Sequence, residues 1–313
     1  MNRRTFLGAG LAMGAGPGPV EGSPKGHPPS ERRNPSASRS IASEAFGNTD
    51  YDAIWYLVNV GFLIRLQGSF ILLDPIFSGD NPEYVQTREK YQATGRPQVE
   101  VKHYDLEQVY TQPSHFPLRA DEVKKADVVL LTHEHTDHCD PRSIQKIAHL
   151  KPKIVASKAC HKDLLKQGIA AGLLVEGRYG SAFDFENFSI EIQYSDHSPG
   201  ACGFLIKTRH GNIYHPGDNR FDHERKNEMC NLDVDYLLLP INDTNFGVGF
   251  AALLTQILQP RVVIPCHFGF FYPPVRSQGG HPAEYVTAIA ARNYHIPNTD
   301  IVILKPGGKY VLV

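Results

Sequence analysis

Cysteine is scarce in this chain, and its spacing excludes two classes of small-protein architecture. The 313 residues include five cysteines, an odd number, and none of them forms a C-x-x-C pair. A disulfide framework or a thiolate zinc site would need such pairing or spacing. Each cysteine is therefore interpreted as a small buried hydrophobic residue.

The chain also lacks an excess of charge and any long apolar run. Lys and Arg number 32 against 33 Asp and Glu, and the mean hydropathy is −0.31. No net positive field is available to hold nucleic acid or an anionic membrane, and no apolar stretch is long enough to span a bilayer. The remaining composition, 41% hydrophobic and 21% charged, is typical of a soluble globular protein. We expect neither nucleic acid nor a membrane span among its interactions.

The first residues resemble an export signal. Arg3 and Arg4 precede a Phe-Leu pair and a weakly apolar, Gly/Ala-rich stretch, which is similar to a twin-arginine signal. The resemblance implies that residues 1–16 are recognised by the twin-arginine export machinery and that the protein is periplasmic or extracellular. A basic N-terminus of a cytoplasmic protein is the alternative. Residues 17–47, rich in Pro, Ser and Gly, are predicted to be a disordered linker, and residues 48–313 one folded domain.

The folded part begins with β-rich runs and continues as strands alternating with helices, which predicts an α/β domain. Residues 77–120 show neither periodicity, and so long a loop in a compact domain is usually functional, so we interpret it as a candidate substrate lid. The predicted strands are residues 53–58, 61–66, 69–73, 127–131, 153–156, 188–194, 202–208, 212–215, 234–239, 261–265, 301–304 and 309–312, and the predicted helices are 141–150, 158–167, 248–258 and 282–293.

A dense group of metal-binding side chains follows the apolar strand at 127–131. The sequence THEHTDH places three histidines and an aspartate within six residues. Residues two apart on an extended chain point the same way, so His133 and His135 can bind one ion while Asp137 and His138 turn toward a second. Two surface histidines would explain a lone His-x-His equally well. The full pattern directly after an apolar strand is far more specific.

This motif resembles the signature of the metallo-β-lactamase superfamily, which implies a single-domain, four-layer α/β fold, the αββα sandwich. The superfamily has three further ligands at later strand ends, and the sequence supplies His197, Asp218 and His267 in that order. Carried over by position, the resemblance assigns His133, His135 and His197 to one ion, Asp137, His138 and His267 to a second, and Asp218 to both.

The expected chemistry is hydrolysis with two divalent ions per chain. Imidazole and carboxylate ligands suit zinc or manganese, with iron a third candidate. Such a site carries net positive charge and attracts anionic substrates, and it lowers the pKa of bound water from ~15.7 toward about 7. A metal-bridging hydroxide would attack a lactone or related ester carbonyl. Asp137, with a spare oxygen, is the candidate catalytic residue that carries a proton to the leaving group.

Several other segments resemble the L-ascorbate-6-phosphate lactonase-like branch of the superfamily. These are the opening strand pair, the central hairpin with its turn, the last ligand strand and the closing segment, at residues 54–64, 203–218, 262–268 and 305–310. Two positions depart from the pattern. Asn59 stands where related sequences often have His or Cys, and residues 242–247 differ from the lactonase. The resemblance implies a lactonase-like hydrolase whose small-molecule substrate stays unassigned.

Other polar and aromatic residues are candidates for the surroundings of the ions. Asp74 ends the strand at 69–73, and we hypothesise that it hydrogen-bonds a ligand histidine; a turn-forming Asp-Pro is the alternative. Loop residues that flank the ligands in sequence either bind substrate or form loop surface. They are Arg220, His223, Asn242, Asn245, Phe270, Tyr272 and Arg276.

Three other functions compete with the lactonase-like interpretation. A phosphodiesterase similar to N-acyl-phosphatidylethanolamine phospholipase D would share the metal chemistry, but the sequence shows no basic amphipathic helix for a lipid surface. A β-lactamase would use other ligands at the second ion. A non-catalytic metal-binding or sensing protein would be favoured by an incomplete ligand set, and here the set is complete.

Overall fold

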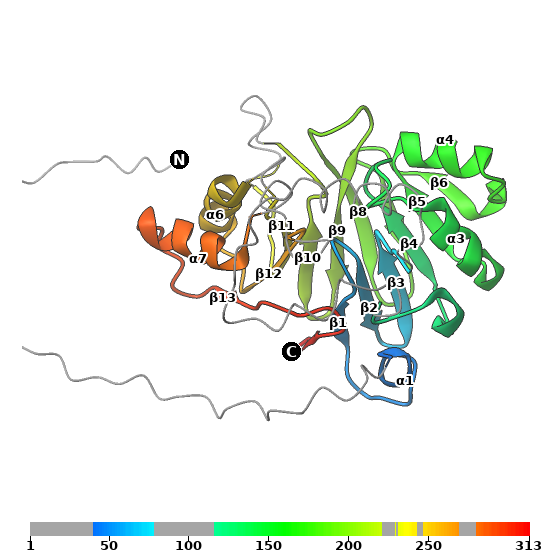
Figure 1. Cartoon of the computed structure of the whole chain (residues 1–313), viewed down its shortest axis with the longest axis horizontal. Coiled ribbons are helices and arrows are strands. Elements are labelled where there is room, and N and C mark those ends of the chain that lie inside the picture. Colours follow the sequence, from blue (N-terminus) through cyan, green and yellow to red (C-terminus); the bar gives the residue numbers. More distant parts are fainter. Residues whose placement is uncertain (1–39, 78–115, 221–228, 230, 243–246, 269–279) are drawn as a thin grey trace, which may run out of the picture. The chain divides into compact units, whose positions relative to one another are not determined.

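Two seven-stranded sheets form the framework of the protein in the computed structural model (Figure 1). The structure describes residues 40–77, 116–220, 229, 231–242, 247–268 and 280–313. In spatial order, the first sheet holds β14 (Lys309–Val311), β1 (Ala53–Tyr56), β2 (Phe62–Leu66), β3 (Ser69–Leu73), β4 (Val128–Leu131), β5 (Lys153–Ala156) and β6 (Leu174–Glu176). The strands from β14 to β3 pair antiparallel, and those from β3 to β6 pair parallel.

The second sheet has the same division into a parallel and an antiparallel half. Its spatial order is β13 (Asp300–Ile301), β12 (Val262–Cys266), β11 (Tyr236–Pro240), β10 (Gly211–His215), β9 (Cys202–Thr208), β8 (Ser189–Tyr194) and β7 (Ala182–Asp184). The strands from β13 to β10 pair parallel, and those from β10 to β7 antiparallel. Strands β8, β10, β11 and β12 therefore run in one direction and end at one edge.

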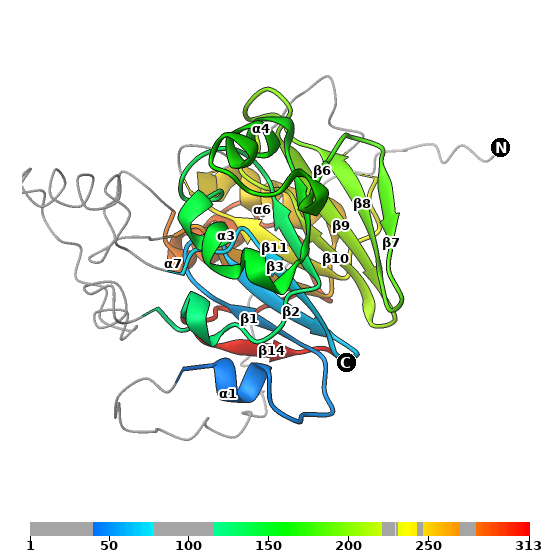
Figure 2. The ribbon, with the colours of Figure 1, turned by 90° about the vertical axis from the view of Figure 1, so that its right-hand side faces the viewer.

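Helices cover the outer face of each sheet. Helices α3 (Pro141–Ile147) and α4 (Lys158–Lys166) lie on the first sheet, and α6 (Gly247–Leu258) and α7 (Pro282–Ala291) lie on the second (Figures 1 and 2). The described residues also form four short helices, α1 (Ala42–Ala45), η3 (Ala120–Glu122), η4 (Ala148–Leu150) and η5 (Ala171–Leu173). The four layers are those of the predicted αββα sandwich, and among the described residues no helix has the length and apolar content needed to cross a membrane.

The apolar pattern of the first sheet explains why it is covered on both faces. In β1, Ile54 and Tyr56 pack in the core between the sheets, whereas Ala53 and Trp55 pack in the core beneath the helices. Successive strand residues point to opposite faces, so a strand without polar residues requires cover on both. The first sheet is therefore an internal layer.

The structure extends the packed region toward the N-terminus. The helix α1 packs beside the first sheet: Ile41 and Ala45 are buried, the Ile41 N–H donates to the Pro117 carbonyl at 3.0 Å, and Phe46 lies 4.9 Å from the Phe70 ring. The last residues of the predicted linker at 17–47 are thus part of the fold, because they carry apolar side chains. Residues 1–39 and most of the candidate lid, 78–115, lie outside the described residues.

Candidate metal centre

All seven predicted ligands meet where the two sheets present their strand ends. They fall into three overlapping groups, in each of which the potential ligand atoms lie within 4.8 Å of one another. We call His133, His135 and His197 the first group, and Asp137, His138 and His267 the second group; His133, His138 and Asp218 connect them.

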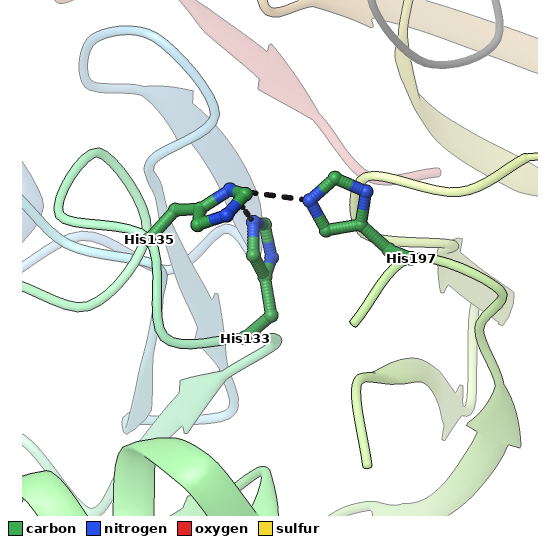
Figure 3. A group of neighbouring side chains, drawn as sticks. All are labelled: His133, His135 and His197. Carbon is green, nitrogen blue, oxygen red and sulfur yellow. Dashed lines mark hydrogen bonds between the residues drawn. The ribbon is translucent and has the colours of Figure 1, made fainter. Parts of the chain in front are cut away.

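The first group joins the loop after β4 to the loop after β8 (Figure 3). His135 Nδ1 lies 3.1 Å from His133 Nε2 and 3.1 Å from His197 Nε2. One ring nitrogen cannot satisfy two others by sharing a single proton, so this convergence calls for a cation. Nitrogen ligands about 2.0–2.1 Å from a tetrahedral zinc lie roughly 3.3 Å apart. The donor set and its spacing fit a metal ion.

The second group combines a carboxylate with two imidazoles. His267 Nε2 lies 3.4 Å from His138 Nε2 and 3.4 Å from Asp137 Oδ2. Asp218 Oδ2 stands 3.4 Å from His138 Nε2 and 3.2 Å from His267 Nε2. Because Asp218 also groups with His133, its carboxylate lies where it can contact an ion on either side.

Burial and charge act in opposite directions on the two groups. Burial, with the nearby charge of His138, lowers the pKa of His133 well below its usual value, and burial together with His135 lowers that of His197. Burial also disfavours a charged His138, but Asp218 and Asp137 outweigh it and hold the pKa of His138 well above the usual value. His267 and His138 in turn hold the pKa of buried Asp218 well below its usual value. The first group accepts a cation readily, whereas the second holds a proton until a metal displaces it.

Asp74 lies directly behind His138, as hypothesised. Its carboxylate is completely buried, accepts hydrogen bonds from the Thr132 N–H at 2.8 Å and the Thr132 hydroxyl at 2.6 Å, and lies 2.8 Å from His138 Nδ1. In this arrangement the Nδ1–H of His138 donates to the Asp74 carboxylate, which leaves Nε2 to face an ion. Burial opposes ionisation, but His138 and His215 keep the pKa of Asp74 well below its usual value.

Two hydrogen bonds around the centre come from residues that were not predicted to belong to the site. Asn59 donates to the Asp137 carboxylate, and Ser198 donates to Glu134 at 2.7 Å, which links the loops of the first group. The sequence did hold a signal for Asn59, because it stands where related sequences often have His or Cys. Ser198 gave none, because its partner is distant in sequence.

The predicted substrate-binding residues have mixed outcomes. Arg220 is exposed, and its charge contributes to the lowered pKa of His197, although burial and the other histidines contribute more. Asn242 is buried after β11. The other candidates lie outside the described residues: His223, Asn245, Phe270, Tyr272 and Arg276.

A groove of about 620 Å³ opens beside His197. Its lining carries charges of both signs, from Lys158, Arg178, Glu176 and Asp196, and Arg178 is paired with Glu176 at 3.0 Å. Tyr179 and Tyr194 form an edge-to-face pair with their ring centroids 6.1 Å apart. The groove therefore offers polar contacts of both signs and aromatic contacts next to the more open part of the metal centre.

Comparisons with known proteins agree with this fold. A UPF0173 metal-dependent hydrolase of Symbiobacterium thermophilum is 29% identical over 205 residues, covering 63% of this chain and 86% of that protein. Two solved structures show the same fold: the metallo hydrolase Igni18 of Ignicoccus hospitalis (TM-score 0.56, 20% identity, 83% and 97% coverage) and the diiron β-hydroxylase of Streptomyces venezuelae (0.56, 13%, 85% and 55%). The family model described as a beta-lactamase superfamily domain matches residues 53–267. The chain therefore belongs to the metallo-β-lactamase superfamily.

Proposed function

We propose that this protein is a metal-dependent hydrolase that uses two divalent ions to cleave a lactone or related ester. The observation that carries the proposal is the meeting of seven ligand side chains from two sheets in overlapping groups. A site for a single structural ion would close its coordination with four protein ligands, whereas a catalytic centre leaves positions open. The similarity to relatives named metal-dependent hydrolases supports hydrolysis.

The ions would supply a water of lowered pKa and a positive centre that polarises the carbonyl. Asp137 would carry the proton to the leaving group, because its side chain is 32% exposed whereas that of Asp218 is 5% exposed. A carboxylate that reaches solvent can exchange a proton with the substrate. The groove beside His197 would hold an arm of the substrate against Tyr179 and Lys158.

The test is metal content and turnover measured on one preparation. The purified protein is reconstituted with zinc, manganese or iron, its ions are counted by mass spectrometry, and hydrolysis is assayed with panels of lactones, esters, phosphodiesters and a β-lactam. Asp137→Ala and His267→Ala remove members of the second group. His149→Ala, an exposed histidine outside the centre, is the matched control.

About two ions per chain and turnover of lactones or esters, lost in both ligand variants but kept in His149→Ala, are expected. Turnover confined to phosphodiesters would overturn the ester proposal and retain the metal hydrolase. An absence of bound metal after reconstitution would overturn the whole proposal. Two bound ions without turnover of any class would favour a metal-sensing role.

We also propose that the chain is exported through its twin-arginine segment. The support is the Arg3-Arg4 pair and the apolar residues after it. Changing both arginines to lysine should keep the protein in the cytoplasm when the cells are fractionated, whereas wild type should be recovered outside it. Equal distributions would contradict this route.

A further inference from the structure

Asn59, between β1 and β2, contacts the second group although no ligand motif includes it. Its side chain is buried, and Nδ2 lies 3.1 Å from the Asp137 backbone oxygen and 3.2 Å from Asp137 Oδ2. Both partners accept, so the amide nitrogen must face them. Asn59 therefore donates to the same carboxylate oxygen that faces His138 and His267.

The rest of the Asn59 side chain adds no competing contact. The amide oxygen Oδ1 is buried and has no hydrogen-bond partner among the described residues. Within that part of the chain, Asp137 orients the amide and is oriented by it in return. This reciprocal contact fixes which carboxylate oxygen is presented to the centre.

The Asn59 backbone reaches the opposite sheet. Its carbonyl oxygen accepts hydrogen bonds from the His267 N–H at 2.7 Å and the Tyr56 hydroxyl at 2.9 Å. Its φ of 58° lies in the left-handed region, which asparagine adopts more readily than most residues. One turn residue thus joins Asp137, after β4 of the first sheet, to His267, after β12 of the second.

We propose that Asn59 is a positioning residue that holds Asp137 and His267 facing one ion. This inference rests on the proposed two-ion function and specifies how the second ion is retained. Asp137 Oδ2 and His267 Nε2 lie 3.4 Å apart, and Asn59 contacts the residue at each side of that gap. Hydrogen-bond partners of metal ligands typically change metal affinity 10–100-fold. The effect should fall on the second group and spare the first.

The variant Asn59→Gly separates the side chain from the backbone. Glycine adopts the left-handed conformation and keeps the carbonyl that accepts from His267, but it removes the amide. Gln67→Gly is the matched control, because Gln67 is exposed in the next turn, between β2 and β3, with a φ of 51°. Asn59→Ala also removes the amide, keeps a Cβ atom and adds no charge beside the ion.

Zinc content is measured after dialysis against increasing concentrations of a chelator. Wild type and Gln67→Gly should lose the ion of the second group at the same chelator concentration. Asn59→Gly and Asn59→Ala should both lose it at a 10–100-fold lower concentration, while the other ion is retained as in wild type. Thermal unfolding of the zinc-free variants shows whether each is folded.

The outcomes separate this inference from the proposed function. The role of Asn59 would be overturned if Asn59→Gly lost the ion of the second group at a chelator concentration within twofold of that for wild type. It would also be overturned if both ions were lost together. Either result would leave the proposed two-ion centre intact. A wild type that binds fewer than two ions would contradict the proposed function itself. If Asn59→Gly does not fold, the Asn59→Ala variant decides by the same measurement.

Discussion

The two groups of the metal centre differ in how firmly the protein holds them. In the second group, His138 is buried and its Nδ1 contacts the Asp74 carboxylate, and Asp137 accepts a hydrogen bond from the Asn59 side chain. In the first group, His133 is equally buried, but His135 is exposed, and His197 Nδ1 has no hydrogen-bond partner in the part of the chain that the structure describes. The second group is held by buried partners before any ion binds, whereas the first reaches solvent at His135, beside the groove.

This difference indicates a division of roles. Ligands fixed by buried partners lose little freedom when an ion binds, so the second group can hold its ion in one geometry. Exposed ligands can adjust while a substrate enters from the groove. Changes to the buried partners should therefore cost stability as well as metal, and changes around the first group should alter metal affinity with little effect on the fold.

The largest effect is expected from Asp74→Ala, which breaks the support of the second group. It removes the partner of a buried imidazole and leaves two Thr132 donors without their acceptor. Removing one member of a buried ion pair costs about 3–5 kcal/mol. Urea unfolding of the chelator-treated protein at pH 7 measures it. The control is Asp184→Ala, at an exposed position in β7, which should lower the free energy of unfolding by less than about 0.5 kcal/mol. An equal loss of stability in both variants would contradict the claim that buried partners support the second group.

The pH dependence of the same contact has a defined sign. His138 and His215 keep the pKa of Asp74 below its usual value of 3.8. A lowered carboxyl pKa contributes stability that is fully present above pH 3.8 and is lost as the pH falls toward the folded-state pKa. The stability difference between wild type and the isosteric Asp74→Asn should therefore not narrow from pH 7 to 5, where the raised pKa of His138 can only widen it, and should narrow below pH 4. A difference that narrows between pH 7 and 5 would assign the effect to another group.

Proton release on metal binding gives a second way to sharpen the comparison. Asp218 and Asp137 keep His138 protonated near neutral pH against the effect of burial, whereas burial keeps His133 neutral. Zinc entering the second group should release about one proton, and its affinity should rise about tenfold per pH unit below the His138 pKa. Zinc entering the first group should release fewer protons, because burial lowers the pKa values of His133 and His197. Calorimetry in two buffers with different ionisation enthalpies measures both steps.

The control for proton release is His138→Ala, which removes the titrating group. The variant should still bind zinc at the first group, and its total release near pH 7 should be about one proton lower than that of wild type. Release equal to that of wild type would place the proton on another ligand, and the electrostatic difference between the two groups would then be wrong.

Much of the fold was predictable from the sequence because its strands carry strong local signals. The continuous apolar runs that became β3 and β5, and the run between turn residues that became β9, have the predicted boundaries. Strand β7 was missed because its outer residues, Ala182 and Asp184, are exposed and show no buried alternation. Strand β6 is three residues long and is defined by its pairing with β5, which no local pattern reveals.

The candidate site also contains some residues that the sequence predicts and some contacts that only the structure reveals. The meeting of the seven candidate ligands could be predicted because metal chemistry restricts their residue types and the motif fixes their spacing. The contacts behind them could be predicted only where a residue ends a strand, as Asp74 does after β3. The link from Asn59 to Asp137 spans 78 positions and depends on a left-handed turn, so it emerged only with the structure.

The smallest effect is expected from Ser198→Ala, which tests the first group. The Ser198 hydroxyl donates to Glu134 at 2.7 Å, and this bond connects the loop of His197 to the loop of His133 and His135. The bond is partly exposed, so its loss should cost about 1 kcal/mol or less. That corresponds to roughly a fivefold weaker hold on the first zinc in a chelator competition, with the second zinc unchanged. Ser43→Ala, at an exposed position in α1, is the control. An equal weakening of both ions would show that the two groups are held as one unit, and the contrast between an open and a fixed half of the centre would fail.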